Sequence, residues 1–154
     1  MTSQMNTPGI STFTYFEADE TLKARVGVEW GEKLARHMHL RDGFSIVVFD
    51  GDILVGLISV YRKTLPLPLV DSFDWYIDIL EVQKEYRRKG IAAGLIQMTC
   101  ERAKREGVYQ VRSWSSEDKI EAIPMWRALG FGLCPALTHA QGKDVRGYFV
   151  AKVL

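Results

Sequence analysis

Six consecutive residues at positions 87–92 combine positive charge with small side chains, and this combination suits an anionic ligand. Three cations precede Gly90, which lets the main chain approach a ligand closely, and Ala92 adds little bulk. The stretch follows an apolar run and opens an amphipathic one, so it stands where a strand passes into a helix. The first N–H groups of a helix lack internal partners, and the helix dipole is positive there. The sequence therefore predicts a phosphate site at this junction. Its residues are Arg87, Arg88, Lys89, Gly90, Ile91 and Ala92.

The elements around this junction follow from hydrophobic periodicity and turn residues. Asp50-Gly51-Asp52 between two apolar runs predicts a hairpin. Residues 64–74 contain Pro66 and Pro68, so we expect a loop there that could overhang a site. Strands are predicted at 11–16, 44–49, 53–62, 75–82, 108–113, from 131 and at 147–153, and helices at 19–40, 90–106 and 118–129.

Two of the predicted helices contain residues that disfavour a continuous helix. Gly27 and Gly31 interrupt the first one, which could therefore be two helices. Asp118 and Glu121 resemble a capping box for the last one, yet Pro124 would then lie inside it. That helix is either kinked or begins near Pro124.

The bulk composition limits the function classes. The chain has 154 residues, 47% of them hydrophobic and 25% charged, which predicts a single domain spanning residues 1–154 with residues 1–10 irregular. The formal net charge of +1 gives no overall basic field for nucleic acid. We see no signal peptide, and no apolar run approaches the ~20 residues of a membrane span. We expect a cytoplasmic protein.

The cysteines and histidines show no metal-ligand spacing, so we predict no metal site. Cys100 and Cys134 lie far apart, and we interpret both as small buried thiols. His37 and His39 are two residues apart, which places them on different faces of a predicted helix. We interpret the histidines as solvated surface residues.

The phosphate motif has a specific context along the chain. The motifs in order are Leu80-x-Val82, Arg87-x-x-Gly90-x-Ala92, Ala122 with Trp126, and Leu129-Gly130-Phe131. With a long amphipathic helix after the second motif, this combination resembles the GNAT superfamily of acyl-CoA-dependent N-acyltransferases. The resemblance covers about residues 44–153 and matches the N-terminal part in element order only.

The resemblance implies a fold and a co-substrate. The fold would be α/β, with a mixed, mostly antiparallel sheet of six to seven strands, a central splayed parallel pair and about four helices. The co-substrate would be acetyl-CoA, with its pyrophosphate on the backbone N–H groups of residues 88–92 and Arg87 at the motif's first position. The pantetheine arm would pair with the strand end at Leu80, Glu81 and Val82.

The resemblance also implies roles for residues of the preceding strand. The N–H of Val82 would stabilise the oxyanion formed when an amine attacks the thioester. Asp78 shares strand parity with Leu80 and Val82, so it is our candidate for the general base, although it could instead form a structural ion pair. Tyr76 could line the substrate site or pack in the core. Glu81 has the opposite parity unless a bulge re-aims it, which favours a solvated or structural carboxylate.

Two positions depart from the family pattern. Many relatives carry a Tyr as general acid where this chain has Trp126, and an Asn where it has Lys119. An indole N–H is not a usable acid, so Trp126 would pack against the pantetheine arm or the core. Both remain candidate cofactor contacts. Another proton donor or water would protonate the thiolate, and the candidates are Ser115, Ser116 and Tyr86.

The implied function is an N-acetyltransferase that moves an acetyl group to a primary amine, either of a small molecule or of a protein. An alternative is a GNAT-like module that binds acyl-CoA without turnover, because a fold does not fix a function. We expect neither nucleic acid nor membrane as a partner. Many relatives pair, and the C-terminal strands could supply a homodimer interface.

Overall fold

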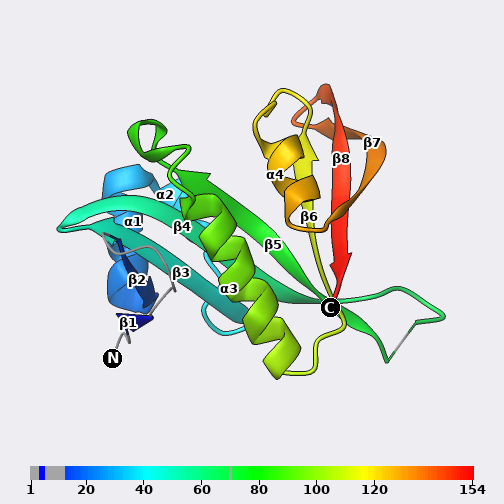
Figure 1. Ribbon diagram of the computed structural model, residues 1–154, viewed down its shortest axis with the longest axis horizontal. Helices are drawn as coiled ribbons and strands as arrows, with labels where there is room; N and C mark the ends of the chain where they lie inside the picture. Colours follow the sequence, from blue (N-terminus) through cyan, green and yellow to red (C-terminus); the bar gives the residue numbers. More distant parts are fainter. Residues whose placement is uncertain (1–3, 6–12, 70) are drawn as a thin grey trace. The chain divides into compact units, whose positions relative to one another are not determined.

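The computed structural model describes residues 4–5, 13–69 and 71–154, and it contains eight strands and four α-helices within those ranges (Figure 1). The strands are β1 (Gln4–Met5), β2 (Thr14–Glu17), β3 (Gly43–Asp50), β4 (Ile53–Thr64), β5 (Phe73–Val82), β6 (Gln110–Ser116), β7 (Gly132–Ala140) and β8 (Lys143–Val153). The helices are α1 (Glu20–Trp30), α2 (Glu32–Arg36), α3 (Ile91–Arg105) and α4 (Ala122–Ala128), with one 3₁₀ turn, η1 (Lys84–Tyr86).

The strands follow the order β1-β2-β3-β4-β5-β6-β8-β7. The pairs β1–β2, β2–β3, β3–β4, β6–β8 and β7–β8 are antiparallel, whereas β5–β6 is parallel. This confirms the predicted mixed, mostly antiparallel sheet with a parallel pair, although the sheet has eight strands in place of the expected six to seven. The register of that pair runs from Trp75↔Val111 to Ile77↔Ser113, and β5 continues beyond it to Val82.

The chain forms two compact units, each built from two separate stretches. The first unit comprises residues 1–62 with 78–99, and the second comprises residues 63–77 with 100–154. Strand β5 and helix α3 each contribute residues to both units. Of the segment predicted to be irregular, only Gln4–Met5 is described, and it pairs with Tyr15 and Phe16. The rest of residues 1–10 lies outside the described residues.

The first unit has helices on both faces of its strands. Val47 and Phe49 of β3 belong to a core that also contains buried residues of α1 and α2, such as Val26 and Ala35. Val48, between them, points to the opposite face, because side chains alternate along a strand. That face receives α3, which crosses the strands toward the viewer in Figure 1. Burial on both faces explains why β3 is apolar without interruption from Ile46 to Phe49.

Helix α1 ends at Trp30 and α2 begins at Glu32, which confirms that two helices replace the single predicted one. Asp19 caps α1 by accepting a 2.9 Å hydrogen bond from the N–H of Leu22. Helix α2 stops at Arg36, so the chain from His37 to Asp42 is a connection to β3 and not part of a helix. The predicted hairpin is confirmed, since β3 and β4 pair from Asp50↔Ile53 onward.

The second unit packs β6, β7, β8 and α4 around its own buried residues. Trp126 of α4 lies edge-on against Phe131 with 4.7 Å between the ring centroids. Helix α4 begins at Ala122 and no side chain caps it, so the predicted capping box is wrong. Pro124 falls in the first turn, where its missing N–H would have had no helical partner. The alternative of a start near Pro124 is the better description.

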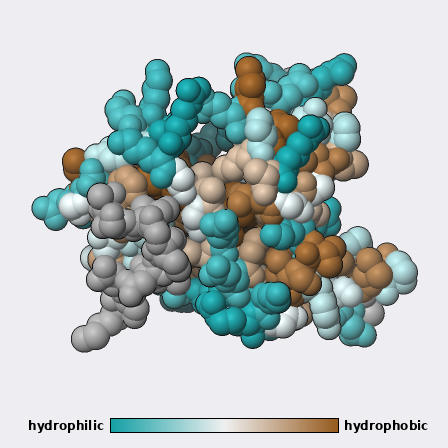
Figure 2. All heavy atoms as spheres, in the orientation of Figure 1, coloured by the Kyte–Doolittle hydropathy of each residue, from teal (hydrophilic) through white to brown (hydrophobic). Residues whose placement is uncertain are grey.

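Hydrophilic and hydrophobic residues share the molecular face in Figure 2. Large exposed hydrophobics include Val28 and Leu67, at 84% and 81% exposure. Within the described ranges, no helix is both long and apolar enough to cross a membrane.

Candidate functional site

The phosphate motif forms the predicted junction between a strand and a helix. Helix α3 begins at Ile91, and the N–H of Gly94 donates a 2.9 Å hydrogen bond to the carbonyl of Gly90. Arg88 has a φ of 63° and Gly90 a φ of 82°, whereas Lys89 between them has no positive φ. This alternation turns successive N–H groups to one side, as in anion-binding nests. The junction therefore offers backbone donors and the positive helix end to an anion.

Neighbouring strands fix the position of this junction in the first unit. A Cβ atom on Gly56 of β4 would come within 2.9 Å of the Ile91 side chain, so the missing side chain lets α3 approach the sheet. The Tyr86 hydroxyl donates to Asp50 at the end of β3 across 2.8 Å. This hydrogen bond to a carboxylate is the main cause that raises the pKa of Tyr86 above its ordinary value.

The end of β5 presents polar backbone groups beside the motif. The N–H of Gln83 donates to the carbonyl of Val55 on β4 across 2.9 Å. Because backbone groups alternate along an extended chain, the N–H of Val82 points to the other edge. Arg87 Nε donates to the carbonyl of Val82 across 3.3 Å. By this alternation, the predicted oxyanion donor would be directed away from β4.

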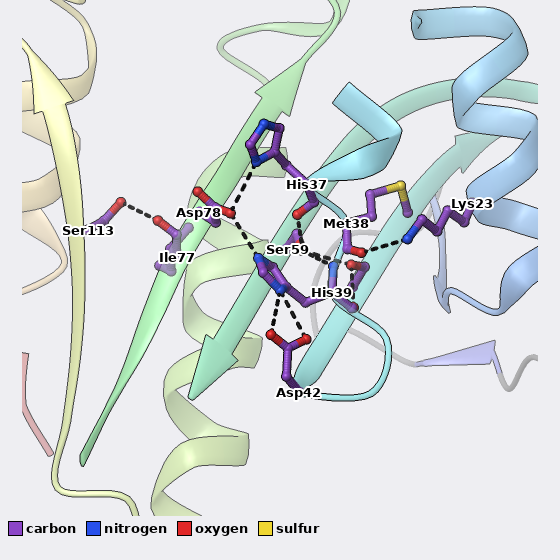
Figure 3. Close-up of polar contacts among 10 residues, drawn as sticks. Lys23, His37, Met38, His39, Asp42, Ser59, Ile77, Asp78 and Ser113 are labelled. Carbon is purple, nitrogen blue, oxygen red and sulfur yellow. Dashed lines mark hydrogen bonds and ion pairs between the residues drawn. The ribbon is translucent and has the colours of Figure 1, made fainter. Parts of the chain in front are cut away.

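Among the residues that the structure describes, the partners of Asp78 are histidines and not Lys or Arg (Figure 3). His39 Nε2 lies 2.8 Å from Asp78 Oδ2, and His37 Nδ1 lies 3.9 Å from the same oxygen. Both histidine contacts go to Oδ2, and no described residue forms a hydrogen bond or ion pair with Oδ1. The Asp78 side chain is 30% exposed, so solvent and ligands can reach it.

A second carboxylate holds the other side of His39. Both carboxylate oxygens of Asp42 lie 3.0 Å from His39 Nδ1. The ring stacks on Tyr61 with 4.5 Å between centroids and an interplanar angle of 28°. Burial, then the charges of Asp78 and Asp42, raise the pKa of Tyr61. The His39 side chain is only 19% exposed, so its interpretation as a solvated surface residue is wrong.

Buried polar groups anchor the connection that carries both histidines. Ser59 accepts a 2.8 Å hydrogen bond from the His39 N–H, and the Ser45 hydroxyl lies 2.9 Å from the His39 carbonyl. These serines are fully buried and 2.9 Å apart on paired strands β3 and β4. Lys23 of α1 also donates to the Met38 carbonyl across 3.1 Å.

The sequence contained a signal for this arrangement that our interpretation did not use. We placed His37 and His39 on a helix, where residues two apart face different sides. The helix ends before them, so that argument does not apply. Ser45 and Ser59 stand in otherwise apolar strands, and a buried hydroxyl needs a partner.

A cavity of about 650 Å³ that is widely open to solvent lies beside this cluster within the first unit. Its apolar lining includes Trp30, Leu34 and Val82. His37 also lines it, and the ring of His37 lies 3.9 Å from Asp78. The remaining lining residues are Lys33, Glu81, Gln83, Lys84 and Arg87. The same cavity is therefore lined by Val82 at the end of β5, by Arg87 of the phosphate motif, and by His37, the partner of Asp78.

Three predicted site residues belong to the second unit. Tyr76 is half-buried, and Lys63 Nζ lies 4.9 Å from its ring centroid. Trp126 is 2% exposed and packs on Phe131, as the core alternative expected. Lys119 is exposed in the turn before α4. Their contacts with substrate or cofactor remain predictions.

The cysteines differ from each other. Cys100 is buried, and burial is the main cause that raises the pKa of its thiol. Cys134 is exposed on β7, so the expectation of a buried thiol is wrong there. In the part of the chain that the structure describes, no group of three or more His, Cys, Asp or Glu side chains could hold a metal ion.

Sequence comparison connects this site with known proteins. A model of the acetyltransferase (GNAT) family matches residues 11–131. N-alpha-acetyltransferase 30 of Schizosaccharomyces pombe is 30% identical over 98 residues. That match spans 61% of this chain and 61% of the relative.

Structural comparison gives the same fold. NAA60 of Arabidopsis thaliana in complex with a bisubstrate analogue aligns with a TM-score of 0.75 at 15% identity, covering 92% of this chain and 98% of that one. The same protein in complex with acetyl-CoA aligns with a TM-score of 0.73 at 15% identity, covering 93% and 99%. At this identity the likeness shows the fold alone.

Proposed function

We propose that this chain, which belongs to the acetyltransferase (GNAT) family, transfers an acetyl group from acetyl-CoA to a primary amine. The observation that carries the proposal is the cavity beside β5. It is lined both by Val82 and Arg87 and by His37, whose ring lies 3.9 Å from Asp78. Such a space can hold a thioester and an amine near the Asp78 carboxylate, whose partner His37 lines it.

The residues of the junction fit acetyl-CoA. The alternating backbone at Arg88 and Gly90, followed by the N-terminus of α3, suits a pyrophosphate. The cations at positions 87–89 complement its charge. Leu80, Glu81 and Val82 would pair with the pantetheine arm, and the N–H of Val82 would donate to the thioester oxygen. Lys119 and Trp126 are further proposed contacts.

Asp78 is the proposed general base. An amine enters as an ammonium ion, and Asp78 Oδ1 takes one of its protons and releases it to solvent. The nitrogen lone pair then forms the N–C bond, the C–S bond breaks, and sulfur keeps the electron pair. A second proton from the nitrogen ends on the thiolate, so the reaction produces one amide, one thiol and one free proton. Tyr76 is a proposed substrate contact.

A dedicated general acid is not required by this chemistry. A thiol ionises near pH 8.5, so its thiolate is a tolerable leaving group near neutral pH. Ser115 is buried, and the Tyr86 hydroxyl donates to Asp50. We propose that water protonates the thiolate.

The proposed acceptor is the α-amine of a peptide or protein. The match to a protein named N-alpha-acetyltransferase favours this class. The apolar wall of the cavity, formed by Trp30, Leu34 and Val82, suits a first side chain beside the amine. Small-molecule amines are the second class to test.

A binding module without turnover is the second candidate function. The observation that favours it is Trp126, which lies buried where many relatives have a catalytic Tyr. Thiol release from acetyl-CoA, measured with a panel of peptides and small amines, separates the two functions. Turnover with any amine supports the enzyme. Calorimetric binding of coenzyme A without turnover on the whole panel supports the module.

A further inference from the structure

His39 lies between two carboxylates and contacts each through a different ring nitrogen. Nε2 lies 2.8 Å from Asp78 Oδ2, and Nδ1 lies 3.0 Å from both oxygens of Asp42. Figure 3 shows the ring in this bridging position between β5 and the start of β3. Stacking on Tyr61 fixes the plane of the ring.

This geometry determines which hydrogen bonds the ring can make. An ionised carboxylate only accepts, and a neutral imidazole has one donor and one acceptor nitrogen. Only a ring with protons on both nitrogens donates to both Asp42 and Asp78. A ring protonated on both nitrogens would make two charge-assisted hydrogen bonds in this position, one to each carboxylate.

The surrounding chain restrains the ring independently of these bonds. The N–H of His39 donates to the buried hydroxyl of Ser59, and its carbonyl lies 2.9 Å from the hydroxyl of Ser45. The Asp42 carbonyl accepts a 3.0 Å hydrogen bond from the N–H of Arg62. Backbone atoms on both sides of the ring are thus attached to paired strands.

We propose that His39, held by Asp42, is a positioning residue that orients Asp78 so that Oδ1 faces the incoming amine. This inference rests on the proposed function, because it assigns Asp78 the amine's proton. The His39 ring occupies Oδ2 across 2.8 Å and restrains rotation of the carboxylate. His37, whose ring lines the cavity at 3.9 Å from Oδ2, also faces this oxygen.

The test compares His39→Ala and Asp42→Asn with the native chain and with a matched control. His139 pairs with Asp144 across 2.9 Å on the exposed β7–β8 hairpin, so His139→Ala removes a histidine–aspartate contact of similar length. Steady-state kinetics report kcat and the KM for acetyl-CoA. Thermal unfolding shows whether each variant is folded. Proton–nitrogen NMR of the native histidine rings reports which ring nitrogens carry protons near pH 7.

We expect His39→Ala to lower kcat about 10-fold to 100-fold, the range for a hydrogen bond to a charged group, with little change in the KM for acetyl-CoA. Asp42→Asn lowers kcat less, and His139→Ala leaves it unchanged. Added imidazole partly restores the His39→Ala variant, which a purely structural role would not produce. In the native protein, both ring nitrogens of His39 carry protons.

Two results overturn the inference alone: native turnover in a folded His39→Ala variant, or an NMR spectrum in which His39 carries one ring proton. If His39→Ala does not fold, the kcat of Asp42→Asn and the NMR spectrum of the native His39 ring test the inference instead. A native chain that turns over no amine overturns the proposed function and, with it, this inference.

Discussion

Arg87 Nε donates a hydrogen bond to the carbonyl oxygen of Val82 across 3.3 Å. This contact ties the first residue of the phosphate motif to the last residue of β5. The two residues also line the same cavity. Arg87 therefore has a geometric role in addition to its charge, since it links the proposed pyrophosphate site to the proposed oxyanion donor.

Replacing Arg87 with lysine separates these two roles. Lysine keeps the positive charge but cannot place a guanidinium Nε at the Val82 carbonyl. We expect the affinity for coenzyme A, measured by calorimetry, to weaken about 2- to 10-fold, the usual worth of one hydrogen bond. Arg105→Lys, at the exposed C-terminal end of α3, is the control and should not change affinity. Equal affinity of both variants and the native chain would exclude the geometric role.

Replacing Gly90 with alanine tests the backbone of the phosphate site. Gly90 has a φ of 82°, which costs an alanine about 1–2 kcal/mol. If the loop shifts to relieve this strain, its N–H groups no longer face the phosphates. A loss of about 1 kcal/mol in binding free energy would then raise the Kd for coenzyme A about fivefold. Gly142→Ala in the β7–β8 turn, with a φ of 76°, carries the same strain and should leave affinity unchanged. Equal losses in both variants would count against a phosphate site at Gly90.

The fold could be predicted from this sequence to a large extent, because its signals are local. The Asp50-Gly51-Asp52 turn and the apolar runs beside it specify a hairpin, and Gly31 separates α1 from α2. The phosphate motif could be placed at the start of α3 for the same reason. The strand–helix–strand order predicted at 75–82, 90–106 and 108–113 indicates the parallel β5–β6 pair, because such a short connection implies a crossover between parallel strands.

The acid–base cluster was harder to predict because it depends on contacts between segments far apart in sequence. His39 and Asp78 are 39 residues apart and meet only after β3, β4 and β5 are in place. The prediction also assumed a helix through His37, although α2 ends at Arg36. Cys134 was misassigned because residue type indicates average burial and not the position of one strand residue.

Replacing Tyr15 with phenylalanine should not destabilise the protein. The Tyr15 hydroxyl is buried and has no hydrogen-bond partner among the residues that the structure describes. Removing an unsatisfied buried hydroxyl should leave the unfolding free energy unchanged or raise it by up to about 1 kcal/mol. Denaturant unfolding of the native chain and the variant measures this difference in unfolding free energy. Tyr86→Phe removes the 2.8 Å hydrogen bond to Asp50 and should lower stability, which provides the comparison.

The stability of the Tyr15→Phe variant should also depend on pH differently from that of the native chain. Burial raises the pKa of Tyr15 above its ordinary value. A raised folded-state pKa gives stability that is fully present below the unfolded pKa, about 10, and is lost as the pH rises further. Tyr15→Phe should therefore lose less stability than the native chain above about pH 10. A steeper alkaline loss in the variant would contradict this assignment.

The two thiols should react at very different rates with iodoacetamide. Cys134 is exposed, whereas burial lowers access to Cys100 and raises the pKa of its thiol. Because the thiolate is the reactive species, we expect one rapid adduct per native chain, located at Cys134 by mass spectrometry. Cys134→Ser should remove the rapid phase. Rapid labelling of Cys100 in that variant would show that its burial is not maintained in solution.

The central claim is that Asp78 accepts the proton of the attacking amine, and the kcat of Asp78→Asn tests it most directly. Asparagine keeps the shape and the contact with His39 but cannot take the proton. We predict that kcat for amine acetylation falls by about 10²- to 10⁴-fold, while the calorimetric Kd for acetyl-CoA changes less than about twofold. An Asp78→Asn variant with native kcat would contradict it.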